Sequence, residues 1–368
     1  MGSRSLSIVD GRSREMFELL IQSSTKSYPI TIGVGNLEGL KSTDAIVIAD
    51  SKLEHVSKLF GDRVINIEAN EAKKNLATCE SVIEQMKALR ANRDTSVIAV
   101  GGGFVQDIAT LVSALYMRGI SWTYVPTTLM SMMDSCIGGK SSINVGDAKN
   151  LIGNFYPPME ILIDLAFVGS LEDAAIASGL CEGVKICYAK GPSAFAAFCA
   201  FRQGLTDYAT PLGAELVSHV LNAKKWFVET DEFDQGPRKL LNFGHTFGHA
   251  LESATEFAVP HGIAVGVGVL AALSHPLSHQ GPNEQRLEEE CLSILAPVAK
   301  EFNAAFLKFD AHKFEKAFLG DKKHSKESLR LVLSQQGTLR LVDVERNQKA
   351  VAEAVTAMHS ALAKVGRL

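Results

Sequence analysis

The first part of the chain alternates short apolar runs with amphipathic segments. Residues 45–49 and 96–100 are nearly continuous apolar runs, which is typical of strands that are covered on both faces. Residues 121–125 and 161–165 repeat this pattern, and residues 104–118 carry apolar positions at helical spacing. Strands that alternate with helices predict a mostly parallel sheet with helices on both faces, a Rossmann-like α/β fold.

After about residue 168 the pattern changes to long stretches rich in Ala and Leu. These stretches, residues 171–190, 214–229 and 245–255, predict helices. One exception is the segment 328–342, where two apolar alternating runs flank Gln335-Gln336-Gly337-Thr338 and predict a small hairpin.

The length of 368 residues exceeds the roughly 250–300 residues at which a single core stops growing. We therefore expect an α/β domain over residues 1–168 and an all-α domain over residues 169–368, with a cleft between them.

Composition narrows the class of protein. The formal net charge is −4 with no basic stripe, which argues against a nucleic-acid partner. No apolar run reaches the ~18–20 residues that cross a bilayer, so we expect no membrane partner and a cytoplasmic location. The six cysteines form no CxxC pair and are expected to be buried, reduced thiols: Cys79, Cys136, Cys181, Cys187, Cys199 and Cys291.

A glycine run joins the second apolar run to the helix that follows it. Gly101-Gly102-Gly103 lets a backbone approach a pyrophosphate, and the helix N-terminus offers free N–H groups to it. Asp107 near this turn could hydrogen-bond a ribose or an amide, and Asp50 at the end of an earlier strand could hold a ribose hydroxyl. The pattern is not GxGxxG, and a plain tight turn is the alternative.

Three histidines fall close together in an apolar segment. His245 and His249 are four residues apart and share one face of a helix, and His261 follows in Pro260-His261-Gly262. This clustering favours a metal site, and imidazole suits Zn, Fe, Ni or Cu. Glu182, an acid inside an apolar stretch, is the best candidate for a carboxylate ligand, and an ion pair with Lys185 is the alternative role.

A loop after the strand at residues 121–125 combines Asp134, Gly139-Lys140 and Lys149-Asn150. Lysine serves as a point charge for phosphate, so the loop predicts a site for an anion and hydroxyl groups, although it is not a P-loop. Further cations could contribute, and the alternative for each alone is a solvated surface charge: Arg118, Lys224, Arg238, Lys322 and Lys323.

Together and in this order, the motifs resemble the dehydroquinate synthase family of sugar phosphate cyclases. The resemblance extends from about residue 45 to residue 341. It is carried by these segments: Gly101-Gly102-Gly103 with Asp107, Arg118-Gly119, Val125-Pro126-Thr127-Thr128, Asp134 with Gly138-Gly139-Lys140, Lys149-Asn150, Glu182 with Lys185, Arg238 with Asn242, Gly244-His245 with Gly248-His249, His261-Gly262, and Asp321-Lys322-Lys323.

The resemblance implies an enzyme, usually a homodimer, that uses NAD and a metal, typically Zn or alternatively Co, on a small phosphorylated sugar acid. It implies Glu182, His245 and His261 as metal ligands. The implied catalytic residues are Asp134, Lys140, Asn150, Lys185 and His249. The implied substrate contacts are Arg118, Lys149, Lys224, Arg238, Asn242, Lys322 and Lys323. The implied NAD contacts are Asp50, Glu71, Lys74, Gly102, Gly103, Asp107, Thr127 and Thr128.

Lys224 and Arg238 match the positions that bind a substrate carboxylate in this family. We therefore expect 3-deoxy-arabino-heptulosonate 7-phosphate as substrate and 3-dehydroquinate as product. Ile263, Gln106 and Gly183 depart from the family pattern. The alternatives are another cyclase (of the aminodehydroquinate, valiolone or 2-deoxy-scyllo-inosose type), a metal-dependent alcohol or glycerol dehydrogenase, and a non-catalytic binding protein.

Overall fold

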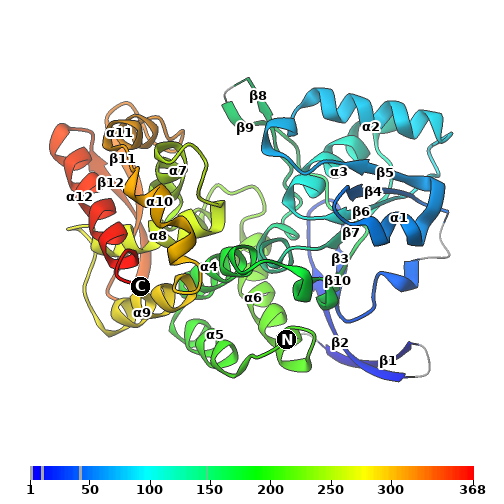
Figure 1. Ribbon diagram of the computed structural model, residues 1–368, viewed down its shortest axis with the longest axis horizontal. Coiled ribbons are helices and arrows are strands. Elements are labelled where there is room, and N and C mark those ends of the chain that lie inside the picture. The colour runs from blue at the N-terminus through cyan, green and yellow to red at the C-terminus, as the bar shows by residue number, and fades with distance from the viewer. Residues whose placement is uncertain (1–2, 10–11, 41–43, 147) are drawn as a thin grey trace. The chain divides into compact units, whose positions relative to one another are not determined.

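The computed structural model describes residues 3–9, 12–40, 44–146 and 148–368 (Figure 1). The chain forms two compact units. The first unit comprises Met1–Leu171 and Gly204–Glu232, and the second comprises Glu172–Gln203 and Phe233–Leu368. The division near residue 168 that the sequence predicts lies close to the end of the first segment. The return of residues 204–232 to the first unit was not predicted.

A mostly parallel sheet forms the first unit. Within the described residues it has eight strands in the order β1-β2-β3-β10-β7-β6-β4-β5, of which β3 to β5 in this order run parallel and β1 and β2 are antiparallel. The strands are β1 Ser3–Val9, β2 Arg12–Ile21, β3 Tyr28–Gly33, β4 Ile46–Asp50, β5 Val64–Ile67, β6 Val97–Gly101, β7 Trp122–Pro126 and β10 Glu160–Asp164. The predicted strands correspond to β4, β6, β7 and β10, whose apolar side chains are largely buried, as double coverage requires.

Helices cover this sheet, and short segments follow its strands. The helices are α1 Glu54–Phe60, α2 Leu76–Ala88, α3 Gly103–Leu115 and α6 Pro211–Thr230. The short segments are η1 Glu38–Leu40, η2 Gly61–Arg63, η3 Glu71–Lys73, η4 Tyr116–Arg118, the π-turn η5 Ser131–Ser135 and η6 Leu165–Ser170. A separate antiparallel hairpin consists of β8 Ile143–Val145 and β9 Ala148–Ile152.

The second unit is helical, as predicted, with one hairpin. Its helices are α4 Asp173–Lys190, α5 Pro192–Gly204, α7 His245–Ala254, α8 His261–Ser274, α9 Pro282–Leu295, α10 Ala299–Leu307, α11 Ala311–Leu319 and α12 Gln348–Val365, with the short η7 Pro237–Asn242. The predicted hairpin is present as β11 Ser328–Gln335 and β12 Thr338–Glu345. Helix α8 is buried along nearly its whole length and packs against α4, α7, α9 and α12, so it forms the core of this unit.

Two predictions from composition can be compared with the structure. All six cysteines lie in the described part of the chain, and each is buried without a disulfide partner there, as expected. Among the described residues, the structure contains no helix with the length and apolar character needed to span a bilayer.

Candidate functional site

Close packing of three helices brings the candidate metal ligands together in the second unit. A Cβ atom on Gly262 of α8 would lie 2.3 Å from the backbone oxygen of Ser178 in α4, and one on Gly268 would lie 2.1 Å from the backbone oxygen of Gly244 before α7. Only glycine therefore lets α8 approach both neighbours this closely. As a result, Glu182 of α4, the first residue of α7 and the first residue of α8 point into one space.

The donor atoms of Glu182, His245 and His261 converge at distances that fit a metal ion. Glu182 Oε1 lies 3.5 Å from His245 Nε2 and 3.6 Å from His261 Nε2. Both distances are too long for good hydrogen bonds. Ligand atoms around a tetrahedral ion, with bonds of about 2.1 Å, lie about 3.4 Å from one another. The spacing between Glu182 Oε1 and each of the two Nε2 atoms therefore fits that of ligand atoms around a zinc-like ion.

The second carboxylate oxygen of Glu182 has a different neighbour. Lys185 Nζ lies 2.5 Å from Glu182 Oε2, in an ion pair whose side chains are 2% and 1% exposed, although the contact lacks hydrogen-bond geometry. The two roles that the sequence allowed for Glu182 are thus compatible, because Oε2 faces the lysine and Oε1 faces the imidazoles.

Each of the two imidazoles is oriented through its other nitrogen. His245 Nδ1 lies 3.3 Å from the carbonyl oxygen of Phe243, and His261 Nδ1 lies 3.1 Å from Glu252 Oε2. A carbonyl and a carboxylate can only accept, so Nδ1 donates in both rings, and the Nε2 atom of each ring faces Glu182.

His249 is a third imidazole beside this site. The ligand atoms of His245, His249 and His261 lie within 4.8 Å of one another, and the rings of His249 and His261 stack at 5.4 Å between centroids. Loss of water around the rings lowers the pKa of His245 well below its usual value and lowers the pKa of His249 to about 4, with a further contribution from neighbouring positive charge. Both rings are therefore neutral at pH 7, the form that binds a metal.

His261 differs in the direction of its shift. Burial favours its neutral form, but the hydrogen bond and charge of Glu252, together with the charge of Glu182, outweigh burial and raise the pKa of His261. Two carboxylates thus make the surroundings of this ring favourable for positive charge, whether as a proton or as a metal ion.

The remaining candidates in the second unit lie on two short segments. Arg238 on η7 is 5% exposed, and Asn242 at the end of η7 donates from its amide to the carbonyl of Lys239 over 3.1 Å. Lys323 forms a 2.7 Å ion pair with Asp321, whereas Lys322 is exposed. That Arg238, Asn242 and the two lysines bind one substrate stays a prediction.

In the first unit the glycine turn has the predicted form. Gly101 ends β6, Gly102 is the N-cap of α3 and Gly103 is the first residue of that helix. Thr127 N donates to the carbonyl oxygen of Gly101 over 3.1 Å, which places the Thr127-Thr128 segment beside the turn, and a Cβ on Gly102 would come within 3.0 Å of Thr128. Gly102 and Gly103 are partly exposed, and the first N–H groups of a helix are the kind that bind a phosphate.

Several of the predicted NAD contacts form one polar network with the β8–β9 hairpin. Lys74 Nζ lies 2.6 Å from Asp107 Oδ2 and 3.0 Å from Asn150 Oδ1. Glu71 accepts a 2.8 Å hydrogen bond from Asn144, and Asn144 in turn accepts one of 2.9 Å from the backbone N–H of Asn150. Lys74 therefore links the helix that follows the glycine turn to Asn150, one of the predicted catalytic residues. Asp50 lies at the end of β4.

The segment around Asp134 is held from two sides. Lys224 of α6 lies 2.6 Å from Asp134 Oδ1 and also donates to the backbone oxygen of Asp134. Gln106, one of the departures from the family pattern, donates from its amide to the Ser135 carbonyl over 2.7 Å and accepts from the Ser135 hydroxyl over 2.7 Å. Gln106 thus has a structural role in fixing this segment.

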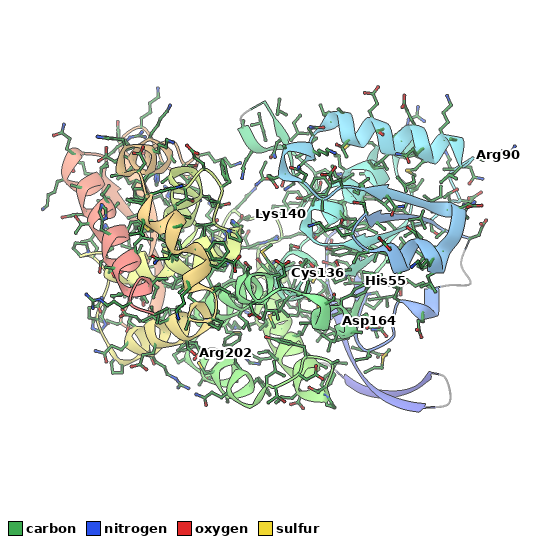
Figure 2. All side chains as sticks on the ribbon, viewed as in Figure 1. His55, Arg90, Cys136, Lys140, Asp164 and Arg202 are labelled. Carbon is green, nitrogen blue, oxygen red and sulfur yellow. The ribbon has the colours of Figure 1, made fainter. Side chains whose placement is uncertain are left out.

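Three further candidates are exposed in the first unit. Lys140, which is labelled in Figure 2, is exposed. Its ammonium lies 5.9 Å from the ring centre of Phe155, and Lys149 lies in the exposed strand β9. Arg118 is exposed at the end of η4 with a left-handed backbone, φ 69°. Their side chains are accessible to a ligand, and their roles stay predictions.

Comparison with known proteins now identifies the family. Residues 64–178 match the model of the 3-dehydroquinate synthase N-terminal domain, and residues 179–324 match that of its C-terminal domain. A 3-dehydroquinate synthase of Clostridium kluyveri is 34% identical over 246 residues, which cover 61% of this chain and 67% of that protein. The chain belongs to the dehydroquinate synthase family.

The fold of this chain is similar to that of solved structures of sugar phosphate cyclases. A 2-deoxy-scyllo-inosose synthase complexed with carbaglucose-6-phosphate, NAD+ and Co2+ superposes with a TM-score of 0.77 at 23% identity, covering 93% of this chain and 99% of that one. The 2-epi-5-epi-valiolone synthase of Streptomyces hygroscopicus subsp. jinggangensis 5008, with NAD+ and Zn2+ bound, gives 0.74 at 21% identity, covering 92% and 98%. As a member of the dehydroquinate synthase family, the chain is a cyclase-type enzyme of the lyase class.

No role was predicted from the sequence for two acids beside the predicted residues, although Asp321 stands in the Asp321-Lys322-Lys323 motif. Glu252 contacts His261 and Asp321 pairs with Lys323. For Glu252 a signal was present, because it lies seven residues after His245 and therefore on the same face of α7 as His245 and His249.

Proposed function

We propose that the chain is a cyclase of the 3-dehydroquinate synthase type, which converts 3-deoxy-arabino-heptulosonate 7-phosphate to 3-dehydroquinate and phosphate. The observation that supports this most is the convergence of one carboxylate oxygen of Glu182 and the Nε2 atoms of His245 and His261. The proposal assigns the metal, Zn or Co, to these three residues and NAD to the glycine turn of the first unit. A homodimer in the cytoplasm is part of the proposal.

A metal held by Glu182, His245 and His261 would supply Lewis acidity at the reacting hydroxyl, and NAD held at the glycine turn would supply reversible hydride chemistry. Asp134 and Lys185 orient the reacting hydroxyls. Lys140, Asn150 and Lys323 hold the phosphate, which leaves by elimination while one of its own oxygens accepts the neighbouring proton.

His249 contacts this phosphate from the side of the imidazole cluster and holds it during elimination. The sugar then opens and closes again in an intramolecular aldol reaction.

The choice of substrate depends on the cations that face its carboxylate. Arg238 is buried and carries a planar fork of donors that matches a carboxylate, and Lys224 is the second cation assigned to it. A substrate without a carboxylate, such as glucose 6-phosphate or sedoheptulose 7-phosphate, would leave the buried guanidinium of Arg238 without this anion. Relatives named 3-dehydroquinate synthase at 34% and 33% identity support the same choice.

A phosphate-release assay tests the proposal. The protein is supplied with NAD and Zn2+ or Co2+ and given 3-deoxy-arabino-heptulosonate 7-phosphate, sedoheptulose 7-phosphate or glucose 6-phosphate, and absorbance of NADH is followed in parallel. Phosphate release with the heptulosonate alone, without NADH accumulation, is the expected result. Release only with another sugar would contradict the substrate assignment, and NADH accumulation would instead indicate a dehydrogenase.

Two variants sharpen this assay. Arg238→Ala is expected to lose most of its heptulosonate turnover, because the substrate carboxylate loses its bidentate partner. Lys239→Ala, a charge removed at the next position of η7, is the matched control and is expected to keep wild-type turnover. Equal turnover by the two variants would remove the carboxylate argument.

A further inference from the structure

Glu252 is a buried acid that neither the sequence motifs nor the proposed chemistry use. It is 8% exposed, and its Oε2 lies 3.1 Å from His261 Nδ1. The two residues come from different helices, since Glu252 lies in the last turns of α7 and His261 is the first residue of α8. The contact therefore fixes the start of α8, where His261, a proposed metal ligand, is located.

The chemistry of the contact determines the state of the ring. An ionised carboxylate has no proton to give, so Nδ1 of His261 must donate. Nε2 of the same ring then has a lone pair, or a second proton, on the side where Glu182 Oε1 lies at 3.6 Å. A lone pair opposite a carboxylate oxygen is repulsive unless a cation lies between them. The geometry is thus that of a ring prepared for a cation at Nε2.

The side chain of the nearby Ile263 cannot accept a hydrogen bond from His261. Ile263, two positions after His261, is 1% exposed and apolar, so it offers no acceptor to the ring. Helix α7 instead presents His245, His249 and Glu252 at positions i, i+4 and i+7, and therefore on one face. This face of α7 therefore supplies the carboxylate that contacts His261.

We propose that Glu252 is a positioning residue, which orients His261 through Nδ1 and increases the electron donation of its Nε2 to the metal. This inference rests on the proposed function, because it needs the metal to bind at Glu182, His245 and His261. Carboxylates that contact a ligating histidine in this way typically account for a 10–100-fold difference in metal affinity. We therefore expect Glu252→Gln to bind metal about 10–100-fold more weakly than the wild type.

The test measures Co2+ binding to the purified, metal-free protein, without substrate or turnover. Competition with a chelator gives the affinity, and the visible spectrum of bound Co2+ reports its ligand geometry. Glu252→Gln keeps the size of the side chain and removes its charge. Glu256→Gln is the matched control, because it makes the same change four residues later at an exposed carboxylate that pairs with Lys313.

The expected result is one Co2+ per wild-type chain, a loss of about tenfold or more in affinity for Glu252→Gln, and affinity within about twofold of wild type for Glu256→Gln. If the wild type bound Co2+ and Glu252→Gln bound it with the same affinity, the role of Glu252 would be overturned and the proposed function would stay in place. A wild-type protein that binds no Co2+ would overturn the proposed metal site itself.

A second variant separates positioning from stability. Glu252→Asp keeps the charge but withdraws the carboxylate by one methylene, so we expect its Co2+ affinity to lie between those of the wild type and Glu252→Gln. Thermal unfolding of the metal-free proteins is measured alongside. A lower unfolding temperature with unchanged Co2+ affinity in both variants would mean a purely structural residue and would contradict the proposal.

Discussion

The substitution Gly262→Ala probes how helix packing creates the metal site. A Cβ at this position would lie 2.3 Å from Ser178 O and 2.6 Å from Ser178 Cα, both backbone atoms of α4. Ordinary van der Waals contact begins at 3.4 Å, so α4 and the start of α8 must separate by about 1 Å. No side-chain rotation can relieve this overlap, because its partners are main-chain atoms of a helix.

The displacement acts directly on the proposed ligands. Glu182 lies one helical turn after Ser178 on α4, and His261 immediately precedes Gly262. Metal–ligand distances tolerate only about ±0.2 Å, so a separation of about 1 Å removes at least one ligand from the ion. We expect the overlap to cost about 1–3 kcal/mol of unfolding free energy. Loss of the partner behind a ligand typically costs about 10–100-fold in metal affinity, and we expect displacement of a ligand itself to cost about a hundredfold.

Urea unfolding of the metal-free protein and Co2+ titration measure the two effects separately. Gly169→Ala is the control, because a Cβ there meets no atom within 4 Å, and it should leave Co2+ affinity unchanged. If Gly262→Ala bound Co2+ as tightly as the wild type, the idea that close approach of α4 and α8 positions Glu182 and His261 would be refuted.

Three other predictions follow from contacts in the two units. Lys74→Met leaves the Asp107 carboxylate without its cation at 2.6 Å, so it should reduce the unfolding free energy on the order of 3 kcal/mol and weaken NAD binding. The control Lys73→Met removes an exposed ion pair and should cost less than about 1 kcal/mol. Equal losses of unfolding free energy in urea for the two variants would contradict this prediction. Burial alone would raise the pKa of Glu284, but hydrogen bonds from Ser334 and from the backbone of Gly337 outweigh it and hold the pKa below its usual value of 4.5. The stabilisation is therefore fully present above that value and is lost as the pH falls through the lower pKa of the folded state, so Glu284→Gln should flatten the acid side of the stability profile; an unchanged profile would argue against it. Dialysis against a chelator should abolish phosphate release. Addition of Zn2+ or Co2+, but not of Mg2+, should restore it, because imidazole nitrogen binds Zn2+ and Co2+ better than Mg2+. Recovery of phosphate release with Mg2+ alone would contradict the ligand assignment.

The sequence predicted the parts of the fold whose signal is local. Continuous apolar runs predicted β4, β6, β7 and β10, and the Gln335–Thr338 turn predicted the hairpin of β11 and β12. Strands β1 and β2 are rich in Ser, Arg and Glu, and every residue of β9 is exposed, so their hydrophobic pattern carries little strand signal. The packing of α6 with the first unit depends on contacts far along the chain, for which the helix itself has no signal.

In the candidate site, too, some residues carry a local sequence signal and others depend on contacts that only the fold creates. The spacing of His245 and His249 and the burial of an acid at Glu182 were visible as patterns, because each conflicts with an apolar segment unless it has a function. The contact between Glu252 and His261 spans a turn between two helices and depends on the angle between them, so only the structure could give it. Gln106, which the sequence marked only as a departure, holds Ser135 through two hydrogen bonds that no linear pattern predicts.

The central claim is that one metal ion binds between Glu182, His245 and His261. Anomalous diffraction from crystals of the Co2+-loaded protein tests it directly. The account predicts a single peak about 2.0–2.2 Å from Glu182 Oε1, His245 Nε2 and His261 Nε2, with a further position open for substrate. A peak held by His245, His249 and His261 without Glu182, or no peak in this region, would contradict it.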